Sequence, residues 1–174
     1  MARKFFTKIR ALLVFTLIIG GSWGLARWAS SEELIVINGK MVTIIDGDSF
    51  KDTNAEYRIY GIDAPEYRQS CKDAAGRDWP CGKSARKALE AALGEGQYSC
   101  DVHARDKYGR TIVTCISGDK NLGSHMVEQG HAISSDNFDH VIYGAEEAQA
   151  EKAKRGIWQG TFEKPSNWRG AHPR

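Results

Sequence analysis

Residues 98–116 have the sequence YSCDVHARDKYGRTIVTCI, and this stretch decides which fold to expect. Residues 98–103 and 111–116 each alternate between apolar and polar side chains, as strands with one buried face do. Between them, residues 106–109 (DKYG) are typical of a turn. We therefore predict a β-hairpin from Tyr98 to Ile116.

Shorter β-like runs precede this hairpin, and helical patterns lie on both sides of it. Residues 34–37 are a brief apolar run that Asn38-Gly39 closes as a turn. The predicted strands before the hairpin are 42–45, 49–51 and 57–62, and the predicted helices are 82–93, 122–129 and 143–154. From Gly160 onwards we predict an irregular tail. Short antiparallel strands with an interposed helix favour an α+β fold built on a small OB-type barrel, which closes its sheet on itself.

The first 26 residues differ in composition from the rest. Four basic residues are followed by an uncharged apolar run from Ala11 to Ala26, as in a secretory signal peptide. The run is short for a membrane span, which needs ~20 apolar residues. An uncleaved anchor stays open as an alternative, because Trp23 and Trp28 suit a membrane interface, and a buried core helix is the third possibility. We expect an exported protein, periplasmic or secreted, that contacts a membrane only through this segment.

The charge of the chain lies mostly in this leader. The chain has 24 Lys+Arg and 22 Asp+Glu, a net charge of +2, and residues 1–26 hold four basic residues and no acidic one. The remainder is therefore slightly acidic. This balance excludes a broad basic surface that binds nucleic acid by counterion release. Local charges or a metal ion would have to hold such a substrate.

Four cysteines follow the leader, and an even number in an exported chain predicts disulfides. Three pairings are possible, while the absence of a Cys-x-x-Cys pair disfavours a zinc site. Cys100 and Cys115 lie at similar distances from the centre of the predicted turn, so they should face each other across the hairpin. Cys71 and Cys81 bracket the loop before the helix at Gly82. We predict the pairs Cys100–Cys115 and Cys71–Cys81.

Three clusters of charged residues stand out. They are Asp46-Gly47-Asp48-Ser49, the group Arg58…Asp63-Ala64-Pro65-Glu66, and Asp106-Lys107-Tyr108-Gly109-Arg110. Taken singly, each has a plain structural explanation, as a turn, a strand end and a solvated hairpin loop. The first does not match an EF-hand loop, because Lys51 stands where that loop needs glycine.

Together the clusters contain what hydrolysis of a phosphodiester requires. Two carboxylates from separate strands can bind a hard cation through oxygen. Two arginines can bind a phosphate and neutralise charge that develops in the transition state. A further carboxylate, Glu66, can accept a proton from water.

The sequence resembles the staphylococcal nuclease (thermonuclease) family from about Met41 to Trp158. The matching stretches occur in the family's order with compatible spacing: VTIIDGDSF, YRIYGIDAPE, DKYGR, MVEQGHA and EAQAEKAKRGIW. The resemblance implies a five-stranded OB-type barrel with about three helices. It also implies a calcium-dependent endonuclease that cleaves DNA and RNA and leaves 3′-phosphates.

Carried over residue by residue, the resemblance implies these roles. Asp48 and Asp63 match the calcium-binding carboxylates, and Ala64 matches a threonine whose backbone carbonyl binds the metal. The remaining matches are Arg58 and Arg110 as phosphate-binding arginines, Glu66 as the general base, Lys107 and Tyr108 beside the substrate phosphate, and Asp46 just outside the metal's ligands.

The chain departs from the family after its second helix, where the family nuclease has a tyrosine-rich stretch that stacks on a base. Residues 134–138 are SSDNF here, so only Phe138 could stack, and Asp136 would repel a polyanion. The resulting scheme has a leader (1–26), a linker (27–40), a nuclease-like domain (41–158) and a tail (159–174). We expect a monomeric nuclease; the alternative is an OB module that binds an oligonucleotide or oligosaccharide, in a cell-envelope pathway for example, without cutting it.

Overall fold

The computed structural model describes residues 34–135 and 142–173. The chain divides into two compact units, Met1–Glu32 and Glu33–Arg174, and every described residue belongs to the second unit. The predicted leader and the first part of the predicted linker therefore lie outside the described residues. Within the described ranges, no helix is long and apolar enough to cross a membrane.

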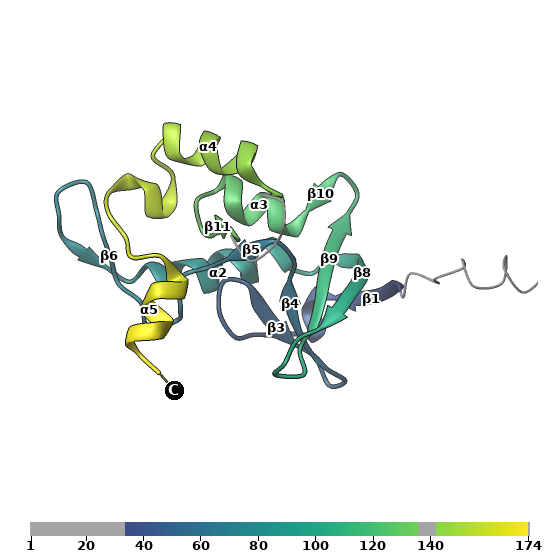
Figure 1. Cartoon of the computed structure of the whole chain (residues 1–174). Helices are drawn as coiled ribbons and strands as arrows, with labels where there is room; N and C mark the ends of the chain where they lie inside the picture. Colours follow the sequence, from purple (N-terminus) through teal and green to yellow (C-terminus); the bar gives the residue numbers. More distant parts are fainter. Residues whose placement is uncertain (1–33, 136–141, 174) are drawn as a thin grey trace, which may run out of the picture. The chain divides into compact units, whose positions relative to one another are not determined.

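A curled sheet forms the centre of the fold, with α-helices packed beside it (Figure 1). The strands are β1 (Leu34–Asn38), β2 (Thr43–Ile44), β3 (Ser49–Lys51), β4 (Glu56–Ile59), β5 (Ile62–Asp63), β6 (Cys71–Lys72), β7 (Asp78–Trp79), β8 (Gln97–Arg105), β9 (Thr111–Ser117), β10 (Lys120–Asn121) and β11 (Ile133–Ser134). The helices are α2 (Cys81–Leu93), α3 (Leu122–Glu128), α4 (Gly144–Lys152) and α5 (Pro165–Ala171), with short 3-10 turns η1 (Gly39–Met41) and η2 (Gly156–Gln159).

The main sheet has the order β1-β8-β9-β4-β3-β2, and β10 also pairs with β9. Its neighbours run antiparallel except β4 and β9, which are parallel. Two small sheets, β11-β5 and β6-β7, lie outside it. The predicted α+β class with an OB-type sheet is confirmed, although the described sheet has seven strands and the described ranges contain four α-helices.

The predicted hairpin is the longest strand pair of the sheet. β8 and β9 pair in a register that places Cys100 opposite Cys115. At the turn, one carboxylate oxygen of Asp106 accepts the backbone N–H groups of Tyr108 and Arg110, and Gly109 adopts a positive φ of 87°. The turn therefore closes because the aspartate binds backbone N–H groups and the glycine tolerates a positive φ.

Helix α2 buries the face that its sequence predicts. Ala85, Leu89, Ala92 and Leu93 are buried, and Gly94 ends the helix with a positive φ. These side chains join the main core, which also contains the inner faces of β4, β8 and β9. A second, smaller core surrounds the pair Cys71–Cys81, with Ile133, Ile157 and three partly buried aromatic residues.

Three boundary predictions were wrong. Residues 34–40, assigned to the linker, form β1 and η1, because the apolar run 34–37 pairs with β8. The strand predicted over 57–62 is broken into β4 and β5 by a turn at Tyr60 and Gly61, where Gly61 has φ 78°. The tail is not irregular, because Pro165 begins α5 at a position where proline is well tolerated.

Candidate active site

Asp48 is the buried centre of the site. It directly precedes β3, in which Ser49 lies opposite Arg58 of β4. Asp48 Oδ1 accepts hydrogen bonds from Arg58 Nη1 at 2.8 Å and from Ser49 Oγ at 2.8 Å. Asp48 Oδ2 accepts the backbone N–H of Ala64 at 2.9 Å. Its side chain is only 2% exposed, so these donors replace water around the carboxylate.

Arg58 joins Asp48 to Asp63. Its Nη1 donates to Asp48, and its Nη2 donates to Asp63 Oδ1 at 3.0 Å. The two carboxylates come from different parts of the chain but lie at neighbouring nitrogens of one guanidinium. Burial alone would lower the pKa of Arg58, but the charges of Asp48 and Asp63 outweigh it and raise that pKa above its usual value.

Asp46 lies next to Asp48, and the described contacts include no ion pair between Asp46 and an arginine. Its Oδ1 accepts the backbone N–H of Asp48 at 3.2 Å. Burial, followed by the negative charge of Asp48 and more weakly that of Glu66, raises the pKa of Asp46 to about 7. The pKa of Asp48 moves the other way: burial opposes ionisation, but Arg58 and the N–H of Ala64 stabilise the carboxylate more strongly.

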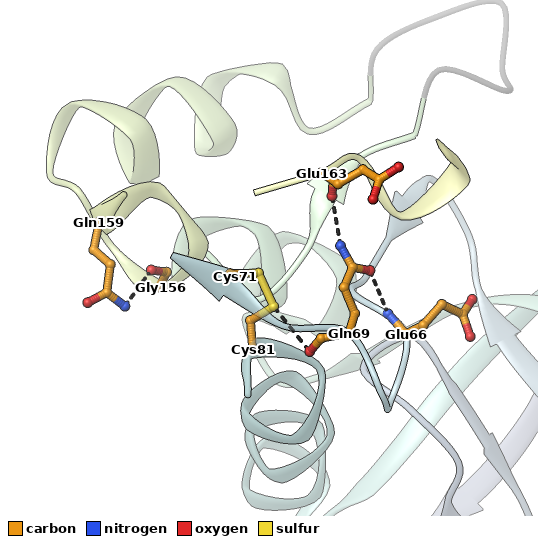
Figure 2. The surroundings of a disulfide bond; sticks show 7 residues. All are labelled: Glu66, Gln69, Cys71, Cys81, Gly156, Gln159 and Glu163. Carbon is orange, nitrogen blue, oxygen red and sulfur yellow. Dashed lines mark hydrogen bonds between the residues drawn. A yellow bond between two sulfur atoms is a disulfide. The ribbon is translucent and has the colours of Figure 1, made fainter. Parts of the chain in front are cut away.

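The loop that carries Glu66 is held by its backbone. The N–H of Glu66 donates to Gln69 Oε1 at 3.1 Å, and the N–H of Gln69 donates to the Glu66 carbonyl at 2.7 Å. Gln69 is 1% exposed, and its side-chain amide donates to the Glu163 carbonyl at 2.7 Å (Figure 2). One buried amide thus connects the Glu66 loop to the C-terminal segment.

Arg110 approaches the buried carboxylates from the β8–β9 turn. Its Nε donates to Asp106 Oδ2 at 2.7 Å, and its Nη1 donates to Ser49 Oγ at 3.4 Å. Because Ser49 Oγ itself donates to Asp48, a single hydroxyl connects Arg110 to the centre of the site.

Lys107 and Tyr108 lie at the tip of the same turn. Tyr108 is 74% exposed, and the charged groups of Lys107 and Arg110 lie 5.1 and 5.6 Å from the centroid of its ring. These two residues are therefore on the surface and do not contact the buried carboxylates in the described interactions. They present an aromatic face next to positive charge.

The Cys71–Cys81 disulfide closes the loop that follows Glu66, as predicted, with its Cα atoms 5.6 Å apart (Figure 2). Cys81 begins α2, and Gln69 precedes Cys71 by two residues. The second predicted pair, Cys100–Cys115, is also confirmed, with its Cα atoms 4.0 Å apart. Both cross-links therefore support elements that carry site residues.

In residues 134 and 135, the described part of the segment 134–138, the structure shows no exposed surface on which a base could stack. Ser134 and Ser135 are both 3% exposed, and β11 pairs with β5 so that Ile133 lies opposite Asp63. Asp136, Asn137 and Phe138 lie outside the described residues.

Arg169 of α5 belongs to the site, although no sequence pattern predicts it. Its Nη1 donates to Asp63 Oδ1 at 2.8 Å and to Glu66 Oε1 at 3.2 Å, and its Nη2 donates to Asp63 Oδ2 at 3.1 Å. These contacts raise the pKa of Arg169, although burial opposes the shift. The Lys164-Pro165 step would have indicated a helix start, but no local signal places Arg169 on Asp63 and Glu66.

Residues 56–160 match the family model of the staphylococcal nuclease homologues. The chain belongs to this family. The matched region begins with β4 and includes Arg58, Asp63, Glu66 and Arg110, whereas Asp48 precedes it and Arg169 follows it.

Curated members with similar sequences carry two kinds of description. The succinoglycan biosynthesis protein ExoI of Rhizobium meliloti (strain 1021) is 33% identical over 119 residues, which are 67% of this chain and 62% of ExoI. The probable endonuclease LCL3 of Verticillium alfalfae is 27% identical over 181 residues, covering 95% of this chain and 61% of LCL3. The probable endonuclease lcl3 of Sclerotinia sclerotiorum is 26% identical over 141 residues, covering 73% and 52%. This staphylococcal nuclease homologue thus spans 52–62% of the length of these relatives.

The chemistry of this family member's site suits a hard cation. Asp48 and Asp63 supply carboxylate oxygens, the donors that calcium prefers. Two guanidinium groups, those of Arg58 and Arg169, already pair with these carboxylates, so a metal ion would have to compete with positive charge that is present in the site. Among the described residues, however, no group of three or more His, Cys, Asp or Glu side chains is arranged as a metal site.

Proposed function

We propose that this protein is a calcium-dependent nuclease that hydrolyses phosphodiester bonds of DNA, RNA or both. The observation that carries the proposal is the Arg58 fork, which holds Asp48 and Asp63 side by side. Family membership and the similarity to two probable endonucleases support it further.

Asp48, Asp63 and the backbone carbonyl of Ala64 are the ligands that would hold calcium. Since calcium takes ~6–8 oxygen ligands, water and the substrate phosphate must supply the others. Modest affinity for the ion, increased by substrate, is the consequence. Once bound, calcium would stabilise negative charge on the phosphate; Asp46 would lie just outside its ligands, hydrogen-bonded to the N–H of Asp48.

The other residues divide the remaining chemistry between them. Glu66 would accept the proton of the attacking water, whose oxygen bonds to phosphorus as the bond to the 5′ oxygen breaks, leaving a 3′-phosphate. Arg58 and Arg110 would donate to the phosphate as its charge grows. Lys107 and Tyr108, at the exposed tip of the β8–β9 turn, would lie along the substrate strand.

Cleavage of plasmid DNA and of a single-stranded RNA by the purified full-length protein tests this proposal. We expect cleavage with calcium and none in excess chelator, with activity restored when calcium is added back. Cleavage that leaves a 3′-phosphate also creates a free 5′-hydroxyl, so a polynucleotide kinase should label the product ends without prior phosphatase treatment. Undiminished cleavage in chelator would refute calcium dependence.

The similarity to ExoI, a protein named for succinoglycan biosynthesis, favours a second candidate. In this alternative, the OB-type sheet binds an oligosaccharide without cutting a phosphodiester. Titration of the protein with oligosaccharides and oligonucleotides separates the two: tight binding of sugars with no cleavage of nucleic acid would favour the alternative.

We also propose that the protein acts outside the cytoplasm. Two disulfides support this location, since such bonds persist in oxidising compartments. Cell fractionation followed by thiol labelling tests it: the protein should be found in the exported fraction with no reactive thiol.

A further inference from the structure

Arg169 occupies two carboxylates of the proposed site: Asp63, a proposed metal ligand, and Glu66, the proposed general base. It donates to both oxygens of Asp63, at 2.8 and 3.1 Å, and to Glu66 at 3.2 Å. The Asp63 side chain is 5% exposed and the Glu66 side chain 12%, so solvent reaches little of either carboxylate while Arg169 is bound to them. Arg169 lies beyond the region that matches the family model.

The chain leading to α5 is firmly attached to the domain. The N–H of Lys72 donates to the Thr161 carbonyl at 2.8 Å, and buried Gln69 donates to the Glu163 carbonyl (Figure 2). A Cβ added to Gly160 would lie 2.2 Å from the Lys72 carbonyl oxygen, so the two backbones are in close contact. These contacts hold the start of α5 near the site without help from the ion pairs of Arg169 with Asp63 and Glu66.

Helix α5 itself is held far less tightly. Pro165 is its one buried residue, most of the other positions are exposed, and a Cβ added at Gly170 would meet open space. Arg169, with its side chain 34% exposed, makes the ion pairs between this helix and the domain. A short, exposed helix on a fixed attachment can move away when that contact breaks.

We propose that Arg169 is a built-in competitor of the metal ion, which must displace it from Asp63 and Glu66 before the site can work. This inference rests on the metal site of the proposed function. A guanidinium that uses both oxygens of Asp63 leaves few lone pairs for a metal ion. Its positive charge also repels that ion. Metal binding and release of α5 are then one coupled equilibrium.

The expected size of the effect follows from this coupling. The apparent dissociation constant rises by the inverse of the fraction of molecules in which Arg169 is released. Arg169 is held by charge-assisted hydrogen bonds, so its released form should be the minor state, on the order of a tenth of the molecules. Removing the competitor should therefore raise calcium affinity about tenfold, or somewhat more.

Calorimetric titration of the full-length protein with calcium tests the inference without reference to activity. We expect Arg169→Gln to bind calcium about tenfold more tightly than the natural chain. Arg77→Gln is the matched control: it removes the same charge from an exposed arginine that pairs only with Asp73 in the described contacts, and its affinity should not change. Arg169→Lys keeps the charge but cannot bind both oxygens of Asp63 at once, so its calcium affinity should lie between those of the natural chain and Arg169→Gln.

Equal affinity of the natural chain and Arg169→Gln would overturn the competition while leaving the nuclease proposal intact. If neither protein bound calcium, both proposals would fail. Hydrogen exchange gives a second measurement on the natural chain: calcium should accelerate exchange of the amides in residues 165–173. Calcium binding that leaves this exchange unchanged would refute release of α5.

Discussion

Arg110 is the arginine of the site whose removal leaves the buried carboxylates paired. It contacts Asp106 and Ser49, while Asp48 keeps its bonds to Arg58 and Ala64. We predict that Arg110→Ala folds normally and loses ~10²–10³ in cleavage rate, the usual loss when one charge-stabilising donor is removed. The measurement is initial plasmid cleavage with saturating calcium. Arg105→Ala, an exposed arginine at the end of β8, is the control and should cleave at the normal rate.

Replacing Arg58 should also affect stability, because this arginine holds buried carboxylates in the folded protein. Its side chain is 16% exposed, and its loss would remove the ion-pair partner of buried Asp48 and leave Asp63 paired with Arg169 alone in the described contacts. Breaking a buried pair in this way typically costs ~3–5 kcal/mol. We predict that Arg58→Ala lowers the free energy of unfolding by about this amount, measured by urea denaturation. A fully stable Arg58→Ala would show that the fork is not what holds the two carboxylates.

At the level of elements, the approach of α2 to the Glu66 loop depends on Gly82. A Cβ at this position would lie 1.8 Å from the Glu66 carbonyl oxygen, a backbone atom that cannot rotate away. Gly82→Ala must therefore displace either the start of α2 or the loop that carries Glu66. We predict a lower melting temperature and a loss of cleavage together, measured by thermal unfolding and plasmid assay.

Gly170→Ala in α5 is the control for this change, since a Cβ there meets nothing within 4 Å. Alanine is also a better helix former than glycine by ~1 kcal/mol. The stability of Gly170→Ala should therefore equal or slightly exceed that of the natural chain. Normal cleavage by Gly82→Ala would contradict the link between α2 and Glu66.

At the level of the whole molecule, the two disulfides should differ in what they protect. Both close short loops, and the chain-entropy estimate gives ~3 kcal/mol for each. Cys71–Cys81 lies in the small core beside the Glu66 loop, whereas Cys100–Cys115 lies in the main core between β8 and β9. We predict that replacing either pair by alanine lowers stability, and that replacing Cys71 and Cys81 also lowers cleavage well below the unfolding temperature.

Thermal unfolding and cleavage at a temperature where both variants stay folded separate these effects. Proportional losses of stability and activity in both variants would argue against a special role for Cys71–Cys81. The C-terminal segment is attached to this small core, where the Trp158 and Phe162 rings meet edge to face. Loss of the Cys71–Cys81 bond should therefore also disturb the position of Arg169.

Local patterns in the sequence determined much of this protein. The alternation around Asp106-Lys107-Tyr108-Gly109 predicts the β8–β9 hairpin and the Cys100–Cys115 pair, and the helical spacing of Ala85 and Leu89 predicts α2. These features depend on neighbours in the chain and on a period of two or 3.6 residues, so they can be inferred before folding. The motifs that mark the family are local for the same reason.

Only the tertiary structure decided which charges meet. Arg58 joins Asp48 to Asp63 because β3, β4 and β5 come together, and Gln69 bonds to Glu163 because the C-terminal segment returns to the Glu66 loop. Arg169 reaches Asp63 across most of the domain's sequence. No periodicity encodes such contacts, since ion pairs and buried amides select their partners by position in space once the apolar core has brought the elements together.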